Sequence, residues 1–250
     1  VSLVPWLASM KLNRFYVAHW FHADDSGIHP TSTYNETDET VRREWTPPYE
    51  KARMYAAEVV PGPCHMDMWE YACAGYKEAF PDLIGKGKSA RNPHERSYPQ
   101  RVPCASNPDL AKILTSVMTN LAAQGASEVM VWMSEYPAAQ CECEACVKQG
   151  QYRGEARAAL QAWKEARAGA HRDLKLSVFF GRGGRGSPPR YPDQEIQDIA
   201  AFLPPEVTLR VSMGCDGPDG RLLADLAAQG RRIARMDVAG LAEIDREGHA

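Results

Sequence analysis

Short apolar runs of strand length alternate with helix-length segments along most of this chain, and this alternation constrains the fold more than any other feature. Residues 129–133 are apolar at every position, as expected for a strand that is covered on both faces in a parallel sheet. A helical pattern precedes them, with Pro108 in its first turn and Gly125 at its end. Strands that alternate with helices in this way predict an α/β fold with parallel strands.

The alternation extends over most of the sequence without a second compositional regime. The predicted strands span residues 12–18, 56–60, 129–133, 174–180, 207–213 and 232–236. The predicted helices span residues 3–10, 68–79, 108–124, 154–169, 193–203 and 219–229. A closed (β/α)8 barrel has eight strands, so we expect an incomplete TIM barrel, roughly strands 2 to 7, in a single domain over residues 1–250 that is truncated at both ends. An open doubly wound sheet is the alternative.

The composition excludes two classes of protein. Lys and Arg number 29 against 32 Asp and Glu, which gives a formal net charge of -3, whereas a nucleic-acid-binding domain is usually strongly basic. No uncharged apolar stretch approaches the roughly 18 residues that a membrane-spanning helix needs. We therefore expect neither a nucleic-acid partner nor a membrane span.

Polar and aromatic residues follow the predicted strands. Because the functional site of a parallel α/β fold lies at the carboxyl ends of its strands, we expect these residues on one rim. Carboxylates and aromatic rings together are what the hydrolysis of a glycosidic bond requires, since one acid protonates the leaving oxygen and rings stack on sugars. The candidate residues that would bind substrate are His19, Trp20, Asp25, His65, Trp132, Ser134, Tyr136 and Arg182.

Glu135 is the candidate general acid, because it follows an apolar strand directly and Trp132 lies three positions earlier. A neighbouring apolar ring can raise the pKa of a carboxyl group and keep it protonated. The alternative is a solvated loop glutamate or a partner for a helix dipole. Asp216 and Asp237 are the candidates for the second carboxylate, and each has an alternative role as a helix N-cap.

The loop that follows the predicted strand 174–180 is rich in glycine and arginine. It formally matches a dinucleotide-binding pattern, but Ser187, Pro188 and Pro189 prevent the helix that such a site needs. Arg182 and Arg185 could instead bind an acidic sugar through bidentate hydrogen bonds, or they are solvated loop charges.

Cysteines are concentrated in one short segment. Cys141, Cys143 and Cys146 lie within six residues, and Cys104 offers a fourth thiol from the preceding loop. Thiolates at this density suit a structural zinc ion, which would stabilise the loop without joining the chemistry. A disulfide, free thiols and an iron–sulfur cluster are the alternatives. We expect no cofactor to be required for the reaction.

Two segments carry a resemblance to a known family. Residues 10–15, Met-Lys-Leu-Asn-Arg-Phe, are followed by His19, Trp20 and an Asp-Asp-Ser-Gly sequence at residues 24–27. Residues 57–65 read Ala-Glu-Val-Val-Pro-Gly-Pro-Cys-His. These segments resemble the second-strand and third-strand motifs of the β-N-acetylhexosaminidases, glycoside hydrolase family 20. Glu135 then stands where the family has the glutamate of its Gly-Gly-Asp-Glu motif, and Ser134 stands where the family has the aspartate that orients the substrate acetamido group.

A closer likeness is to bacterial relatives of hexosaminidases and α-glucuronidases, one branch of which has endo-β-N-acetylglucosaminidase activity. Their pattern is matched by residues 79–83, 87–88, 104–108 and the Cys-x-Cys-x-x-Cys run. The resemblance covers about residues 3–150 well and the remainder only by topology. It implies a TIM-barrel glycosidase with Glu135 as general acid/base, an oligosaccharide or glycan substrate, and an extracellular or periplasmic location. A catalytically inactive carbohydrate-binding barrel is the alternative function.

Overall fold

Two groups of hydrogen-bonded strands form the centre of the protein. The computed structural model describes residues 14–24, 27–31, 49–50, 52–63, 65–91, 101–135, 139–181, 191–212 and 221–236. In the first group, β1 (Arg14–Asp24) runs parallel to β3 (Glu58–Pro63) and antiparallel to β2 (Gly27–Thr31). The second group consists of four parallel strands in the order β5 (Glu128–Trp132), β6 (Lys175–Phe180), β7 (Thr208–Ser212) and β8 (Arg232–Met236).

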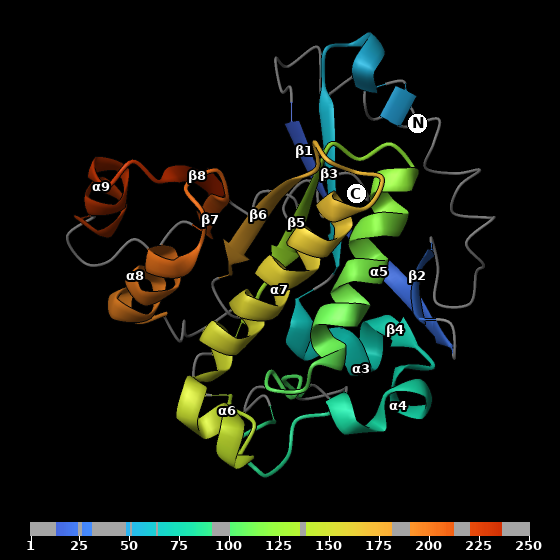
Figure 1. Ribbon diagram of the computed structural model, residues 1–250, viewed down its shortest axis with the longest axis vertical. Helices are drawn as coiled ribbons and strands as arrows, with labels where there is room; N and C mark the ends of the chain where they lie inside the picture. Colours follow the sequence, from blue (N-terminus) through green and yellow to red (C-terminus); the bar gives the residue numbers. More distant parts are fainter. Residues whose placement is uncertain are drawn as a thin grey trace, which may run out of the picture.

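The backbones of β3 and β5 lie against each other and join the two groups (Figure 1). A Cβ atom added at Gly62 of β3 would lie 2.0 Å from the carbonyl oxygen of Met130 in β5. Any side chain at position 62 would therefore collide with rigid backbone, which is the close approach that favours glycine in a strand. The predicted α/β fold with parallel strands is confirmed.

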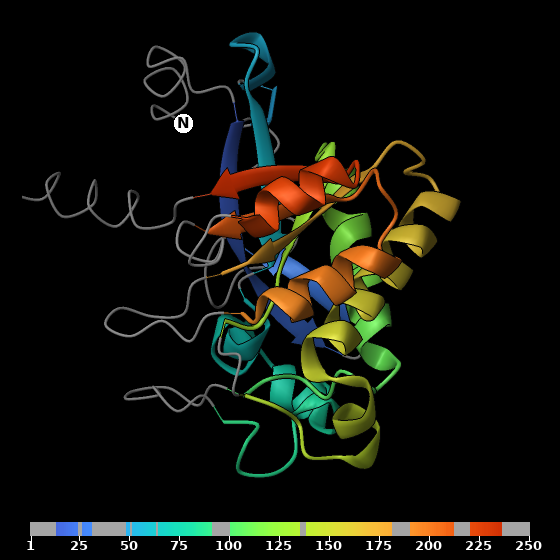
Figure 2. The ribbon, with the colours of Figure 1, turned by 90° about the vertical axis from the view of Figure 1, so that its left-hand side faces the viewer.

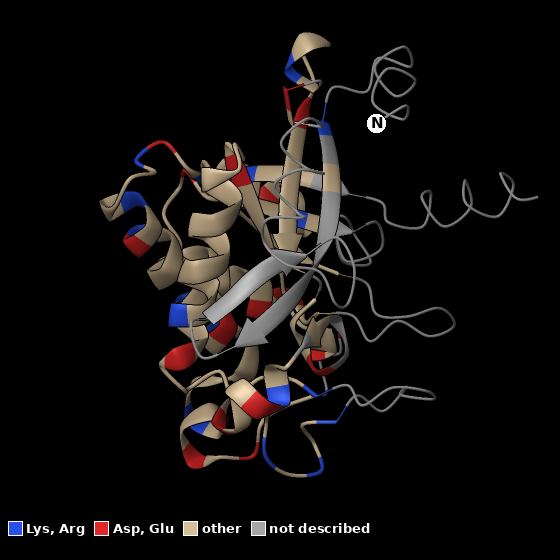
Figure 3. Cartoon of the chain, turned by 90° about the vertical axis from the view of Figure 1, so that its right-hand side faces the viewer, with Lys and Arg blue, Asp and Glu red and all other residues tan. Residues whose placement is uncertain are grey.

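Helices follow the strands and pack on one another in chain order. Four helices form a row in which each contacts the next: α5 (Asp109–Ala123), α7 (Gln151–Ala168), α8 (Asp193–Phe202) and α9 (Arg221–Ala228). In Figures 1 and 2, α5 and α7 lie side by side over the strands. The apolar residues of α5 recur at helical spacing and form its buried inner face. Figure 3 shows the charged residues on helices, loops and strand ends.

A buried ion pair lies on the inner side of the sheet. Nη2 of Arg210 in β7 donates to Oε1 of Glu128 in β5 at 2.7 Å, and both side chains are only 2% exposed. The Arg210 guanidinium also stacks 4.3 Å from the ring centroid of Tyr16 in β1. Because β1 and β7 are not paired in the sheet, this contact requires the sheet to curve until distant strands face each other, as they do in a barrel.

The predicted helix over residues 68–79 is wrong. The chain there forms η1 (Met66–Met68), α3 (Trp69–Ala72), β4 (Cys73–Ala74) and α4 (Tyr76–Ala79). Gly75 has a φ of 77°, which a right-handed helix does not accommodate, and Cys73 and Ala74 pair with β1. Backbone pairing with a distant strand therefore outweighs the local helical pattern.

The hairpin strand β2 and the short helix α6 (Glu144–Gln149) were not predicted. The Cys143 sulfur accepts a hydrogen bond from the Cys146 amide at the start of α6, and Gly150, with a φ of 81°, separates α6 from α7. The other predicted elements differ from the observed ones mainly at their ends, except that the predicted helix 3–10 lies outside the described residues. Within the described residues, no helix is long and apolar enough to cross a membrane.

We expect the replacement of Glu128 by Gln to destabilise the fold by about 3 kcal/mol, because it leaves the buried Arg210 without its charged partner. Urea denaturation followed by circular dichroism would measure the change in the free energy of unfolding. Lys112→Ala is the control, since it removes an exposed ion pair with Asp109 and should leave the free energy of unfolding almost unchanged. Equal losses in the two variants would contradict a structural role for the buried pair.

Candidate functional site

A histidine and two carboxylates meet where β3 and β5 end. His65 and Asp67 follow β3, and Glu135 follows β5. Nδ1 of His65 lies 2.6 Å from Oδ1 of Asp67, and the same oxygen accepts a hydrogen bond from the Glu135 amide at 3.2 Å. The structure therefore brings together the sequence-predicted residues His65 and Glu135, and Asp67 connects them.

Aromatic rings form the wall of this site. The His65 and Trp132 ring centroids are 5.3 Å apart, and the Trp132 indole packs on Phe179 of β6 at 5.0 Å. A Cβ atom at Gly181, directly after β6, would lie 2.4 Å from Oε1 of Glu135 and 2.7 Å from Nε1 of Trp132. Glycine at position 181 thus leaves the space that the carboxyl group of Glu135 occupies beside the indole.

Both Glu135 and His65 have a pKa above the ordinary value, but for different reasons. Burial raises the pKa of Glu135, and the Asp67 carboxylate raises it further, although a charged His65 acts against both. Burial alone would lower the pKa of His65, but its ion pair with Asp67 outweighs that effect and raises the pKa above its ordinary value. A raised pKa favours the protonated form of Glu135, which is the form that a general acid needs.

Ser134 lies at the same strand end but is fully buried, at 0% exposure. Its hydroxyl donates to Oε1 of Glu155 at 2.6 Å and its amide donates to Oε2 of Glu155 at 3.0 Å. Burial raises the pKa of Glu155, in helix α7, to about 7. Because its hydroxyl is directed toward α7, Ser134 cannot contact a ligand without a rearrangement, and the geometry favours a role behind the site.

The other predicted site residues are not described to the level of side chains. His19 and Trp20 lie in β1, where the structure describes only their backbone. Their strand runs parallel to β3 with His19 paired to Pro63, so both residues stand at the same end of the sheet as His65. Five predicted residues lie outside the described part of the chain: Asp25, Tyr136, Arg182, Asp216 and Asp237.

Three residues of this site were not among the sequence-predicted ones: Asp67, Gly181 and Glu155. Asp67 had a recognisable signal, because an acidic residue stands two positions after His65 in an otherwise apolar segment. Glu155 had a signal too, since it lies on the helix face that buries Ala159 and Ala162. Gly181 had a signal as well, because it directly follows the predicted strand 174–180.

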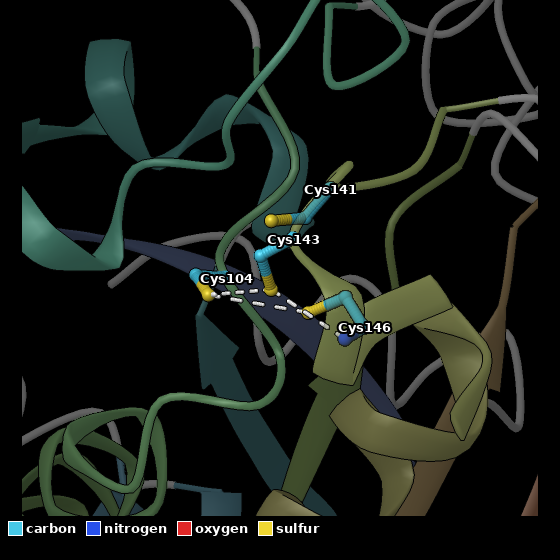
Figure 4. Close-up of side chains that lie close together, drawn as sticks. All are labelled: Cys104, Cys141, Cys143 and Cys146. Atoms are coloured by element: carbon cyan, nitrogen blue, oxygen red, sulfur yellow. Dashed lines mark hydrogen bonds between the residues drawn. The ribbon is translucent and has the colours of Figure 1, made fainter. Parts of the chain in front are cut away.

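The four predicted metal-ligand cysteines converge in one place (Figure 4). Their sulfurs all lie within 4.8 Å of one another, and Sγ of Cys104 is 3.7 Å from Sγ of Cys143 and 3.9 Å from Sγ of Cys146. A tetrahedral zinc with bonds to sulfur of about 2.3 Å spaces its sulfurs about 3.8 Å apart. The donor set therefore fits such an ion, while the sulfurs are too far apart for a disulfide.

Hydrogen-bond donors surround the sulfurs of the cluster. Backbone amides donate to sulfur at three points: Lys86 to Cys141 at 3.4 Å, Ser106 to Cys146 at 3.3 Å and Cys146 to Cys143 at 3.4 Å. Hydrogen bonds from Cys141 and Cys146 hold the pKa of the Cys104 thiol well below its ordinary value. Amides that donate to sulfur in this way can support thiolate ligands of a soft divalent cation.

We expect Asp67→Asn to lower the pKa of His65, because burial then acts without the opposing carboxylate. An NMR titration of the imidazole protons would measure the shift. In the wild type, the raised pKa stabilises the fold below the ordinary pKa of histidine, and this stabilisation disappears as the pH rises through the folded-state pKa. Asp67→Asn should remove that pH dependence.

Asp82→Asn is the control for this titration, since Asp82 is an exposed acid whose backbone carbonyl, and not its carboxylate, accepts a hydrogen bond from Asn107. It should leave the pKa of His65 unchanged. An unchanged His65 pKa in Asp67→Asn would mean that the two side chains do not form an ion pair in solution.

Comparisons with known proteins identify the fold. The chain matches no known family profile and no curated protein sequence. It is similar in structure to a glycoside hydrolase family 20 β-N-acetylglucosaminidase, with a TM-score of 0.57 and 11% identity over 94% of this chain and 48% of the other. A β-N-acetylhexosaminidase gives a TM-score of 0.57 and 13% identity over 94% of this chain and 50% of the other.

The fold extends to proteins with other chemistry. Morphinone reductase in complex with tetrahydroNAD gives a TM-score of 0.54 and 13% identity over 93% of this chain and 70% of the other. The chain spans about half the length of the two hexosaminidase-type structures. At these identities the likeness concerns the fold alone. The protein has the α/β architecture of an incomplete TIM barrel, and among solved structures it resembles glycoside hydrolases.

Proposed function

We propose that the protein is a glycoside hydrolase that cleaves a β-linked N-acetylhexosamine or a related glycan, uronic acid-containing glycans included. The observation that carries the proposal is the environment of Glu135. This carboxyl group follows β5, has a raised pKa and lies beside Trp132 and His65. The fold likeness to hexosaminidases supports the same reaction class.

In the proposed reaction, Glu135 donates its proton to the oxygen of the leaving sugar as the glycosidic bond breaks. Burial raises the pKa of Glu135, which favours the protonated form that this step needs. Asp67 accepts a hydrogen bond from the Glu135 amide and pairs with His65, so it holds both residues in position. His65 and Trp132 would contact the sugar next to the scissile bond.

The second carboxylate of the reaction is Asp237 or Asp216 in this proposal. A separation of about 5–5.5 Å from Glu135 would predict retention of configuration at the anomeric carbon, whereas about 6.5–9.5 Å would predict inversion. We further propose that residues from neighbouring strand ends bind the remainder of the glycan: His19, Trp20, Asp25, Tyr136 and Arg182.

Replacement of Glu135 by Gln should lower kcat by about 10²–10⁴ on chromogenic glycosides with ordinary leaving groups. The panel would include N-acetylglucosaminides and glucuronides. The loss should be far smaller on a dinitrophenyl glycoside, because that leaving group needs no proton. In the wild type, activity should fall as the pH rises through the raised pKa of Glu135, since only the protonated acid is competent.

Glu78→Gln is the matched control for this experiment, because Glu78 is exposed on α4 and lies outside the site. Its activity should equal that of the wild type. Full activity of Glu135→Gln would contradict the assignment of the acid.

A catalytically inactive carbohydrate-binding barrel is the second candidate function. The observation that favours it is the buried hydroxyl of Ser134, which stands where the resembling family has a substrate-orienting aspartate. Binding of chito-oligosaccharides without turnover would support this function. The measurement is isothermal titration calorimetry beside the hydrolysis assay.

We also propose that Cys104, Cys141, Cys143 and Cys146 bind one structural zinc ion. The sulfur spacing and the amide hydrogen bonds to sulfur support it. When bound, zinc would cross-link the loop that carries Cys104 to helix α6. It would supply stability to the fold and would take no part in bond cleavage.

Elemental analysis of the purified protein should find about one zinc per chain, and Cys141→Ser should lose it together with thermal stability. Cys73→Ser is the control, since Cys73 is a buried cysteine outside the cluster and its replacement should leave the metal content unchanged. Iron with visible absorbance would identify an iron–sulfur cluster instead. A metal-free protein with unchanged stability in Cys141→Ser would contradict a metal site.

A further inference from the structure

The backbone that carries Glu135 is held by carboxylates rather than by the sheet. The amide of Met133 donates to the Phe179 carbonyl of the neighbouring strand at 3.0 Å. The next two amides donate elsewhere, Ser134 to Glu155 at 3.0 Å and Glu135 to Asp67 at 3.2 Å. The position of this turn therefore depends on two buried acidic side chains.

Glu155 holds Ser134 from behind the site. Its side chain is completely buried in α7 and accepts three hydrogen bonds, from the Ser134 amide, the Ser134 hydroxyl and Nε2 of Gln151. The Tyr191 hydroxyl donates to the Ser134 carbonyl. Every polar atom of Ser134 is thus bonded, so the residue preceding Glu135 has little freedom to move.

Gln151 extends this network to the cysteines. It precedes Glu155 by four residues and so lies on the same face of α7. Its Nε2 also donates to the carbonyl of Pro103 at 2.8 Å, and its Oε1 accepts from the Cys141 amide at 3.1 Å. Pro103 precedes Cys104, so one buried glutamine contacts both loops that supply the cysteine cluster.

We propose that Gln151 and Glu155 couple the four-cysteine cluster to the turn that carries Glu135. In this arrangement Glu155 is a positioning residue for Glu135, and Gln151 makes that position depend on the conformation of the cysteine loops. The inference rests on the proposed function only where it treats Glu135 as the acid. The hydrogen bonds themselves can be tested without an activity assay.

The burial of the network argues for such a role. Removing a carboxylate from water costs free energy unless hydrogen bonds satisfy its acceptor sites. An apolar side chain at position 155 would occupy the same space without that cost. The donors that satisfy Glu155 belong to the turn before Glu135 and to Gln151. The carboxylate therefore fixes a particular backbone conformation in addition to filling space.

Hydrogen exchange of the Ser134 and Glu135 amides, read by NMR or by mass spectrometry of overlapping peptides, tests the proposal. Glu155→Gln replaces one acceptor oxygen by an NH2 group that faces donors, so the Ser134 amide should exchange about tenfold faster or more. Chelation of metal from the wild type, or Cys141→Ser, should accelerate the same amides. In Gln151→Leu these amides should already exchange faster, and disturbing the cluster should add no further acceleration.

Helix α7 offers a matched control pair. Nε2 of Gln161 donates to Oε1 of Glu165 at 3.0 Å, which is the same residue types at the same spacing on the exposed face. Gln161→Leu and Glu165→Gln should leave the exchange of residues 134 and 135 unchanged. If Glu155→Gln does not fold, Ser134→Ala removes only the hydroxyl contact and should still accelerate exchange.

The outcomes separate this proposal from the proposed function. Unchanged exchange in the folded Glu155→Gln and Ser134→Ala variants would overturn the positioning role, whatever the activity. Acceleration by cluster disruption that persists undiminished in Gln151→Leu would overturn the coupling. Faster exchange in a protein that cleaves no glycoside would leave the coupling intact and contradict only the proposed function. In an active enzyme, Glu155→Gln should lower kcat with little change in KM.

Discussion

The close backbone approach of β3 and β5 at Gly62 is the constraint on which the candidate site depends. With no side chain at position 62, the carbonyl of Met130 can lie against the neighbouring strand. The two strands then end side by side, so that His65 and Asp67 meet the turn that carries Glu135. A bulkier residue at position 62 would separate the strands and with them the acid from its neighbours.

Buried charged side chains lie near this contact, and each is paired or accepts hydrogen bonds. Arg210 and Glu128 lie inside the curved sheet and are paired. Glu155 and Asp67 accept hydrogen bonds from the consecutive amides of Ser134 and Glu135. Such groups contribute less to stability than apolar packing of the same volume. They define one arrangement of the backbone and so fix the positions of the side chains at the strand ends.

The cysteine cluster lies behind the same turn. Its loops contact Gln151, whose partner Glu155 bonds to Ser134. In the proposed function, a metal ion at the cluster therefore stabilises more than its own loop, since it would order the helix face that supports the strand end. Ser134, beside Glu135, belongs to this support, which accounts for its complete burial.

The sequence by itself determined the alternation of strands and helices, because apolar periodicity depends on neighbours along the chain. It also indicated Glu135, Trp132 and His65 by their positions at strand ends, and the four cysteines by their spacing. It failed for residues 68–79, where pairing with β1 interrupts a helical pattern. Only the tertiary structure decided that Asp67 and Glu155 hold the turn before Glu135. Their roles depend on hydrogen bonds between residues 21 and 68 positions apart in the chain, and no local pattern records which distant donor a buried carboxylate meets.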